Sequence, residues 1–155
     1  MTDENNPDSI LDALGFAPPF GMGGADWSAV PDTPGVYVLF DQDEIVYVGM
    51  AGRDQKGSLR RRLRDHASGQ IVNMFAQYLL FARLLVRDDR PKTPRQAALE
   101  CRAYIRARCS ARFLSLADKA EAVKVERMLR QRLQPAFNHM EKTAVPGPIA
   151  EGSTS

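Results

Sequence analysis

Two tripeptides separated by nine residues, Gly35-Val36-Tyr37 and Tyr47-Val48-Gly49, constrain the fold of this chain more than any other feature. Each lies in a short β-branched and aromatic run, and the turn-prone residues 41–44 separate the two runs. The pattern predicts a β-hairpin with strands at residues 35–40 and 45–49. Because side chains alternate along a strand, a register that pairs the tyrosines would direct both phenols to one surface. Ordinary cross-strand packing would also explain two tyrosines in a hairpin.

The length of 155 residues and the apolar content of 44% indicate one globular domain with a substantial core. We expect residues 1–30 to form a flexible leader that could contain a short helix, and residues 31–140 to form the domain. The Pro, Gly, Ser and Thr content of residues 141–155 predicts a disordered tail. The absence of a signal peptide or long apolar stretch predicts a cytoplasmic protein that does not enter a membrane.

Helix-capping residues predict three long helices. They begin after Ser58, Thr93 and Asp118, and they end near Gly69, near Arg108 and before Pro135. Residues 111–116 are typical of a third strand, whereas residues 81–86 are compatible with either a strand or a helix. The expected fold class is therefore α/β (α+β), a small three-stranded mixed sheet flanked by helices.

Glu126 lies inside the apolar stripe of the last predicted helix. The apolar residues at helical spacing around it are Ala122, Val125, Leu129 and Leu133. A buried ionised carboxylate is costly without a partner, so Glu126 needs an arginine, several hydrogen bonds or a metal ion. A structural ion pair with an arginine at the margin of the core and a metal site both satisfy this need.

Arg62 and His66 lie on the same face of the first long helix as Leu59 and Leu63. Further basic residues surround them in the sequence, namely Arg53, Lys56, Arg60, Arg61 and Arg64. These residues could form a solvated basic face, or they could bind a phosphate backbone. The net charge of +2 does not by itself indicate a nucleic-acid partner.

Taken together and in chain order, these elements resemble the GIY-YIG nuclease domain. The matching elements are Gly35-Val36-Tyr37, Tyr47-Val48-Gly49, Arg62 with His66, Glu126, Pro135 and Asn138. The resemblance covers roughly residues 34–138. The family takes its name from its two tripeptides, and it includes homing endonucleases, some restriction enzymes and the incision subunit of bacterial nucleotide excision repair.

The resemblance implies a metal-dependent endonuclease that hydrolyses phosphodiester bonds in DNA with one Mg²⁺ or Mn²⁺ ion. It implies that Tyr37 and Tyr47 place and deprotonate the attacking water, which requires nearby cations to lower the tyrosine pKa from about 10. Arg62 would hold the scissile phosphate, and His66 would orient Arg62 or a tyrosine, or relay a proton. Glu126 would bind the metal ion, which can take most of its other ligands from water.

Other residues would support this site. Gly35, Gly49 and Asn138 are expected to have structural roles, with Asn138 fixing the hairpin by hydrogen bonds. The five basic residues around Arg62 and His66 would contact nucleic acid. No separate recognition domain is visible, so we expect structured or damaged DNA rather than a long specific sequence, with an oligomer or a protein partner as further options.

Two departures from the family pattern leave alternatives open. Met50 stands where many relatives carry a lysine, so either Arg53 or Lys56 supplies that charge or the site is slower. The interval that contains residues 71–108 is longer than in compact members, which leaves the substrate undetermined. A nucleic-acid-binding module that no longer cuts, and an interaction domain that does not bind nucleic acid, remain the competing hypotheses.

Overall fold

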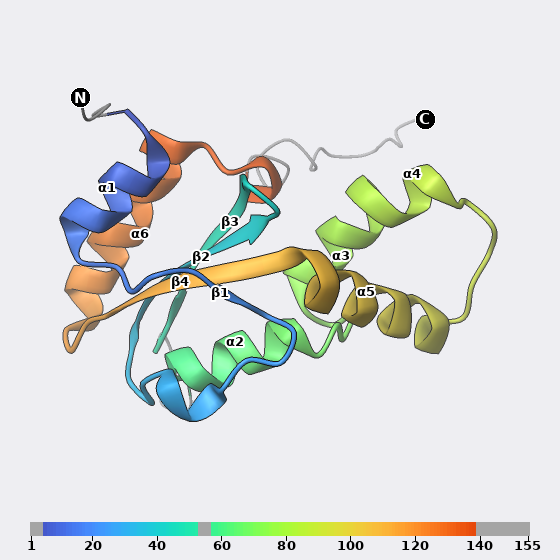
Figure 1. Ribbon diagram of the computed structural model, residues 1–155, viewed down its shortest axis with the longest axis horizontal. Helices are drawn as coiled ribbons and strands as arrows, with labels where there is room; N and C mark the ends of the chain where they lie inside the picture. Colours follow the sequence, from blue (N-terminus) through green and yellow to red (C-terminus); the bar gives the residue numbers. More distant parts are fainter. Residues whose placement is uncertain (1–4, 53–56, 139–155) are drawn as a thin grey trace, which may run out of the picture.

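The computed structural model describes residues 5–52 and 57–138, and its centre is a four-stranded sheet (Figure 1). The strands are β1 (Phe20–Gly21), β2 (Gly35–Asp41), β3 (Glu44–Ala51) and β4 (Cys109–Ser115). Their order is β1-β4-β2-β3, and each described pair is antiparallel. Strand β3 is therefore an edge strand, and β2 lies in the interior of the sheet between β3 and β4.

The predicted hairpin is formed by β2 and β3. Tyr37 pairs with Gly49, and Leu39 pairs with Tyr47. The two tyrosines are therefore diagonal neighbours rather than direct partners, and both project from the same face of the sheet. A bulge at Leu39 and Phe40 shifts the register beyond this point, so it does not disturb the two tyrosine positions.

Helices surround the sheet, and their caps follow the sequence signals. The elements are α1 (Pro7–Leu14), η1 (Trp27–Ala29), α2 (Leu59–Ala67), α3 (Met74–Leu79), η2 (Leu80–Leu84), α4 (Leu85–Arg87), α5 (Pro94–Arg108) and α6 (Lys119–Leu133). Ser58 caps α2 by accepting a hydrogen bond from the Arg61 amide at 3.1 Å. Thr93 and Gln96 form the predicted capping box of α5. Residues 81–86, whose sequence is compatible with a strand or a helix, are helical and include a π-helical turn.

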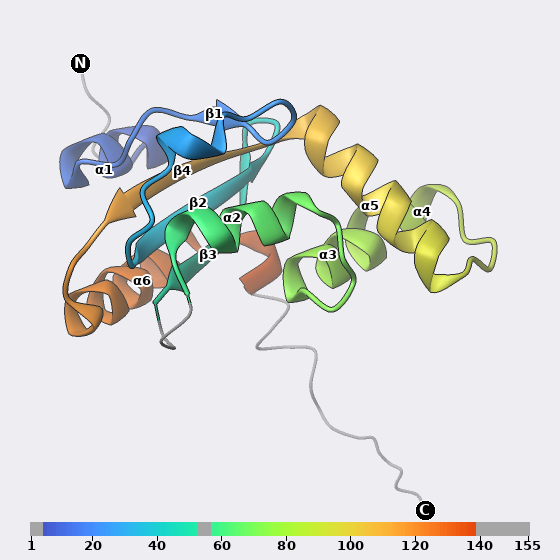
Figure 2. The same cartoon turned by 90° about the horizontal axis from the view of Figure 1, so that it is seen from below.

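The two faces of the sheet bury different sets of side chains. Tyr37 and Leu39 pack into a core that includes residues of α2, α3 and α5. The alternate β2 residues Val36 and Val38 pack with residues of α1 and α6 on the other face. Figures 1 and 2 show this division, with α2 on one side of the sheet and α6 on the other. A site that uses both α2 and α6 must therefore lie at the edge of the sheet.

Part of the predicted leader packs against the sheet. In α1, Ile10 and Leu11 are buried in the core beneath α6. Arg112 of β4 pairs with Asp8 at 3.2 Å and with Asp12 at 2.5 Å, and its side chain is buried. These contacts tie the helix to the sheet. The predicted tail, residues 141–155, lies outside the described residues.

The expected α/β fold with helices around a sheet is confirmed, and two details of the sheet differ. The two-residue strand β1 adds a fourth strand beside β4, and the sheet of the described residues is antiparallel rather than mixed. Two residues are too few to produce an alternating pattern, so β1 leaves no recognisable signal in the sequence. Within the described ranges, no helix combines the length and the apolar character needed to cross a membrane.

Candidate active site

Tyr37 and His66 form a buried hydrogen-bonded pair. The Tyr37 hydroxyl lies 2.8 Å from His66 Nε2, and both side chains are 1% exposed. Strand β2 supplies the tyrosine and α2 supplies the histidine. Burial, with a smaller contribution from the nearby charge of Arg62, lowers the pKa of His66 to about 3. His66 is therefore neutral at pH 7 and orients the phenol without adding charge.

Arg62 lies one turn before His66 on α2 and also hydrogen-bonds to Tyr37. Burial raises the pKa of Tyr37 above its ordinary value, and Tyr47 adds to the rise, while the charge and hydrogen bond of Arg62 act to lower it. The net direction is upward, because the cost of burying a phenolate exceeds the stabilisation by one guanidinium. Arg62 therefore acts on the Tyr37 pKa in the expected direction, but in the cation-free protein it does not offset the effect of burial.

The aromatic rings around this pair fix the position of Tyr47. Tyr47 stacks on Tyr37 with ring centroids 6.3 Å apart, and it lies edge-on to His66 at 5.9 Å. Phe75 of α3 packs against both Tyr47 and His66. Such ring pairs are well defined in geometry and contribute to stability beyond the area they bury. The two phenols are therefore held in place from behind by the core.

Glycine at position 49 leaves room for the Tyr37 phenol. A Cβ atom at Gly49 would lie 2.6 Å from Tyr37 Cζ and would also collide with the hydroxyl. Gly35 is subject to a similar constraint, because a Cβ atom there would collide with the backbone carbonyl of Leu114 on β4. Glycine is thus required at both positions, because neighbouring atoms lie too close to leave room for a Cβ atom.

Asn138 closes the edge of the hairpin. Its Oδ1 accepts a hydrogen bond from the Val48 amide at 2.7 Å, and its Nδ2 donates to the Val48 carbonyl at 3.1 Å. Val48 lies between Tyr47 and Gly49 on the edge strand β3, so the amide side chain takes the place of a further strand. These two hydrogen bonds join the segment after α6 to the hairpin, and the supporting role of Asn138 stays a prediction.

Glu126 reaches the same region from α6, on the other face of the sheet. Its side chain is 10% exposed, and its Oε2 lies 3.7 Å from Nη2 of Arg130, one turn further along the helix. The structure therefore contains an arginine partner of the kind that the burial of Glu126 required. This ion pair lines a pocket that is open to solvent rather than being enclosed by the core.

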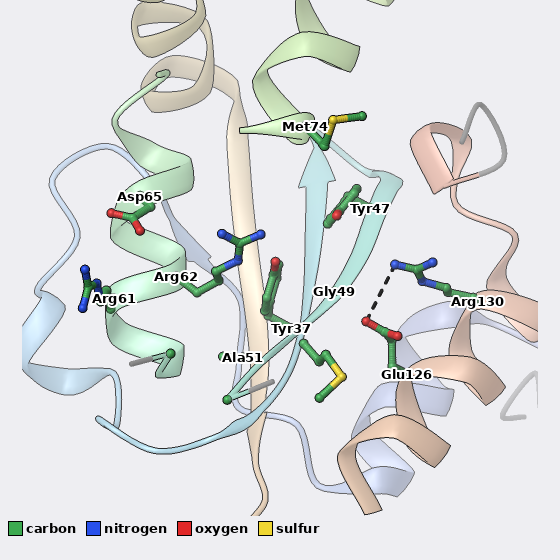
Figure 3. A pocket seen from close by; sticks show the side chains of 13 residues that line it. Tyr37, Tyr47, Gly49, Ala51, Arg61, Arg62, Asp65, Met74, Glu126 and Arg130 are labelled. Atoms are coloured by element: carbon green, nitrogen blue, oxygen red, sulfur yellow. Dashed lines mark ion pairs between the residues drawn. The ribbon is translucent and has the colours of Figure 1, made fainter. Parts of the chain in front are cut away.

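Both phenols, the Arg62 guanidinium and the Glu126 carboxylate line one pocket of about 750 Å³ (Figure 3). The residues that line it include Tyr37, Tyr47, Gly49, Met50, Arg61, Arg62, Asp65, Met74, Glu126 and Arg130. Of the predicted catalytic residues, four line the pocket. His66 is the exception, because it lies behind Tyr37 and reaches the pocket only through the phenol.

Glu126 is the pocket residue that could hold a divalent cation beside the two phenols. Within residues 5–52 and 57–138, no cluster of three or more His, Cys, Asp or Glu side chains could hold a metal ion. Glu126 would have to act as a single carboxylate ligand. Mg²⁺ commonly retains several water ligands and binds through one or two carboxylates with substrate phosphates, and the open pocket leaves room for both.

The predicted nucleic-acid contacts differ in their surroundings. Arg61 lines the pocket and Arg64 is exposed. Arg60 instead donates from Nε to the Val30 carbonyl at 2.9 Å, which ties α2 to the segment after η1. Arg53 and Lys56 lie outside the described residues.

Sequence reasoning missed Arg130 and Asp65 as pocket residues. Both carry a signal that is visible in retrospect, because Arg130 follows Glu126 by four residues and Asp65 follows Arg61 by four. Residues at this spacing share a helix face. Exposed charged residues at this spacing are common, so the pattern alone does not identify a site.

Three comparisons with known proteins gave matches among solved structures alone. No family model and no curated protein matches the chain. Among solved structures, the chain is similar to the GIY-YIG N-terminal endonuclease domain of UvrC from Thermotoga maritima bound to its catalytic divalent cation, magnesium. The TM-score is 0.40 at 20% identity, over 72% of this chain and 90% of that one. Two tyrosine-to-phenylalanine mutants of that domain give TM-scores of 0.40, with 19% and 18% identity over 72% of this chain and 89% and 90% of theirs.

Proposed function

We propose that this protein is a divalent-cation-dependent endonuclease that hydrolyses phosphodiester bonds in DNA at this pocket. One observation carries the proposal: two phenols, a guanidinium and a carboxylate, which four different elements supply, line a single open pocket. The four residues are Tyr37 of β2, Tyr47 of β3, Arg62 of α2 and Glu126 of α6. Core packing alone gives no reason to gather these polar groups at a solvent-accessible edge.

The arginines would bind the substrate. A guanidinium presents a planar set of donors that matches two phosphate oxygens, and Arg62 is already oriented by its hydrogen bond to Tyr37. Arg61 lies in the same lining and would contact a neighbouring phosphate. A phosphate in front of Arg62 would then lie beside both phenols.

The phenols would position the attacking water. In hydrolysis the water oxygen forms a bond to phosphorus and loses a proton, while the bond to one ester oxygen breaks and that oxygen gains a proton. Tyr37 can accept the proton only as a phenolate, and its burial makes the phenolate rare. A divalent cation at Glu126 would supply the additional positive charge that offsets both this cost and the charge developing on the phosphate. Cation dependence thus follows from the burial of Tyr37.

The proposed substrate is structured or damaged DNA rather than a long specific sequence. We assign the activity to residues 31–140, with α1 and β1 as supporting elements. The pocket is open and basic at Arg61, Arg62 and Arg130, which suits a phosphate backbone.

Cleavage assays on a panel of DNA shapes test the proposal. Nicked, branched, single-stranded and plasmid DNA, and a matching single-stranded RNA, are incubated with the protein in Mg²⁺, Mn²⁺ or EDTA. We expect cleavage of at least one DNA in either cation and none in EDTA. Cleavage restricted to the RNA would overturn the choice of DNA.

Glu126→Gln is the decisive variant, and Glu121→Gln is its matched control on the exposed face of the same helix. We expect Glu126→Gln to lose about a thousandfold or more in rate, because it removes the cation ligand, and Glu121→Gln to retain full activity. Cleavage that survives Glu126→Gln would reject the site. DNA binding without cleavage in any condition would favour the non-cutting module instead.

A further inference from the structure

We propose that Arg130 is an exchangeable partner of Glu126: it holds the carboxylate in the cation-free protein, and when a divalent cation takes the carboxylate it turns to bind a substrate phosphate. This inference rests on the proposed function. It assigns a second phosphate-binding guanidinium to the pocket and a coupling between the cation and the nucleic acid.

The first ground is the looseness of the ion pair. Arg130 Nη2 and Glu126 Oε2 are 3.7 Å apart, and the Arg130 side chain is 31% exposed. A direct charge-assisted hydrogen bond is usually 2.7–2.9 Å long. Arg112, the buried structural arginine of β4, pairs with Asp12 at 2.5 Å and donates from Nε to the Ala17 carbonyl at 2.9 Å. The Arg130 pair therefore differs from the structural ion pair in both length and burial.

The second ground is position. Figure 3 shows Arg130 across the pocket from Arg62, with Tyr37 between them. Both arginines line the pocket, so their guanidiniums can act on the same bound backbone from two sides. Glu126 lies next to Arg130 and would otherwise repel a phosphate at this wall. A cation that neutralises this carboxylate would remove the repulsion and would also release Arg130 from its ion pair with Glu126.

The third ground is competition for one carboxylate. A guanidinium and a divalent cation cannot both occupy the same Glu126 oxygens, so each must weaken the binding of the other. Once displaced, Arg130 is a planar donor on a flexible stem beside a pocket that accepts phosphate. Cation binding should therefore strengthen the binding of nucleic acid, and the reverse must also hold.

Direct Mn²⁺ binding to DNA-free protein tests the first half. Free Mn²⁺ is measured by electron paramagnetic resonance during titration of the wild type and of four variants, Arg130→Gln, Arg130→Lys, Arg127→Gln and Glu126→Gln. Arg127 is an exposed neighbour on α6 that does not line the pocket, so its variant controls for the loss of one positive charge. We expect Arg130→Gln to bind Mn²⁺ about three- to tenfold more tightly than the wild type, because a partly exposed ion pair competes only modestly for the carboxylate. Arg127→Gln should bind Mn²⁺ as the wild type does. Arg130→Lys, which keeps the charge, should remain near the wild type.

DNA affinity in the Glu126→Gln background tests the second half, because this variant is expected not to cleave the probe and lacks the Glu126–Arg130 ion pair. Fluorescence anisotropy of a labelled single-stranded 20-mer is measured across a salt series. Adding Arg130→Gln should weaken binding about three- to tenfold and reduce the salt slope by about 0.7–0.9. Adding Arg127→Gln should leave both quantities unchanged.

The outcomes separate this inference from the proposed function. If Glu126→Gln abolishes Mn²⁺ binding but Arg130→Gln binds Mn²⁺ as the wild type does, the exchange is overturned and the nuclease proposal still stands. Unchanged DNA affinity in the Arg130→Gln double variant would overturn the phosphate role. Mn²⁺ binding that Glu126→Gln does not weaken, or no binding by the wild type at millimolar Mn²⁺, would overturn the cation site and the exchange together.

Discussion

The pocket has two walls that are built on different principles. Tyr37, Tyr47 and Arg62 form one, called the tyrosine wall, with His66 buried behind it, and Glu126 with Arg130 forms the other, the carboxylate wall. In the tyrosine wall the Tyr37–His66 hydrogen bond is 2.8 Å long and both side chains are buried. In the carboxylate wall the ion pair is 3.7 Å long, and one helix supplies both partners.

The difference shows which part of the site folding itself requires. Buried polar groups need partners, so the tyrosine wall must assemble for the core to form. The carboxylate wall borders solvent, so its pairing can change without exposing the core. We therefore expect changes in the tyrosine wall to reduce both activity and stability, whereas Glu126→Gln reduces activity alone.

The largest effect in the tyrosine wall is expected for Arg62→Gln. This change removes the phosphate contact and a hydrogen bond to Tyr37, so cleavage should fall about a thousandfold, and the free energy of unfolding by about 1 kcal/mol. Arg61→Gln, on the same helix and in the same pocket, should lose about tenfold in activity with no loss of stability. Single-turnover cleavage and urea unfolding measure the two quantities. Equal losses in both variants would contradict the special position of Arg62.

Tyr37→Phe should lower the cleavage rate about a hundredfold. It should also destabilise the protein by about 1 kcal/mol, because His66 Nε2 loses its partner in the core. Tyr47→Phe leaves that hydrogen bond in place, so we expect a similar loss of rate with a smaller loss of stability. A Tyr37→Phe protein as stable as the wild type would remove the distinction between the two walls.

Gly49→Ala is expected to cost about 2 kcal/mol of stability, because the new methyl group would lie against the Tyr37 ring. Gly21→Ala is the control, since a Cβ atom at Gly21 meets no atom within 4 Å. Thermal unfolding followed by circular dichroism measures both variants. If Gly49→Ala unfolds at the same temperature as the wild type, the Tyr37 ring can move away from position 49 and is not fixed in the tyrosine wall.

The tyrosine wall was largely predictable from the sequence, and the carboxylate wall only in part. The alternation of the hairpin places Tyr37 and Tyr47 on one face, and the helical spacing of Arg62 and His66 places them together on the leucine face. These are local regularities of a strand and a helix. Glu126 was identified because a carboxylate in an apolar stripe needs a partner.

Other features depend on tertiary contacts that no local pattern encodes. The packing of α1 under Arg112 joins residues about a hundred positions apart. The role of Arg130 depends on where α6 meets the edge of β3, and the raised pKa of Tyr37 depends on how deeply the whole core buries the phenol. The sequence could therefore identify the candidate site residues but not their ionisation.

His66 gives the smallest effect and a separate test of the tyrosine wall through pH. Burial lowers its pKa to about 3, whereas an unfolded histidine titrates near 6.5. Below pH 6.5 the unfolded chain binds a proton that the folded protein does not, so stability is complete above pH 6.5 and falls as the pH decreases toward 3. Between pH 6.5 and 5, before most carboxylates titrate, this histidine should remove about 1.5 kcal/mol of unfolding free energy. In His66→Phe the new side chain fills a similar space but does not titrate. The unfolding free energy of this variant should therefore fall between pH 6.5 and pH 5 by about 1.5 kcal/mol less than that of the wild type. This difference is expected even if the variant is less stable at both pH values. Urea unfolding at pH 6.5 and pH 5 measures the difference. If both proteins lose the same unfolding free energy over this interval, His66 is protonated within the fold and the tyrosine wall is open to water.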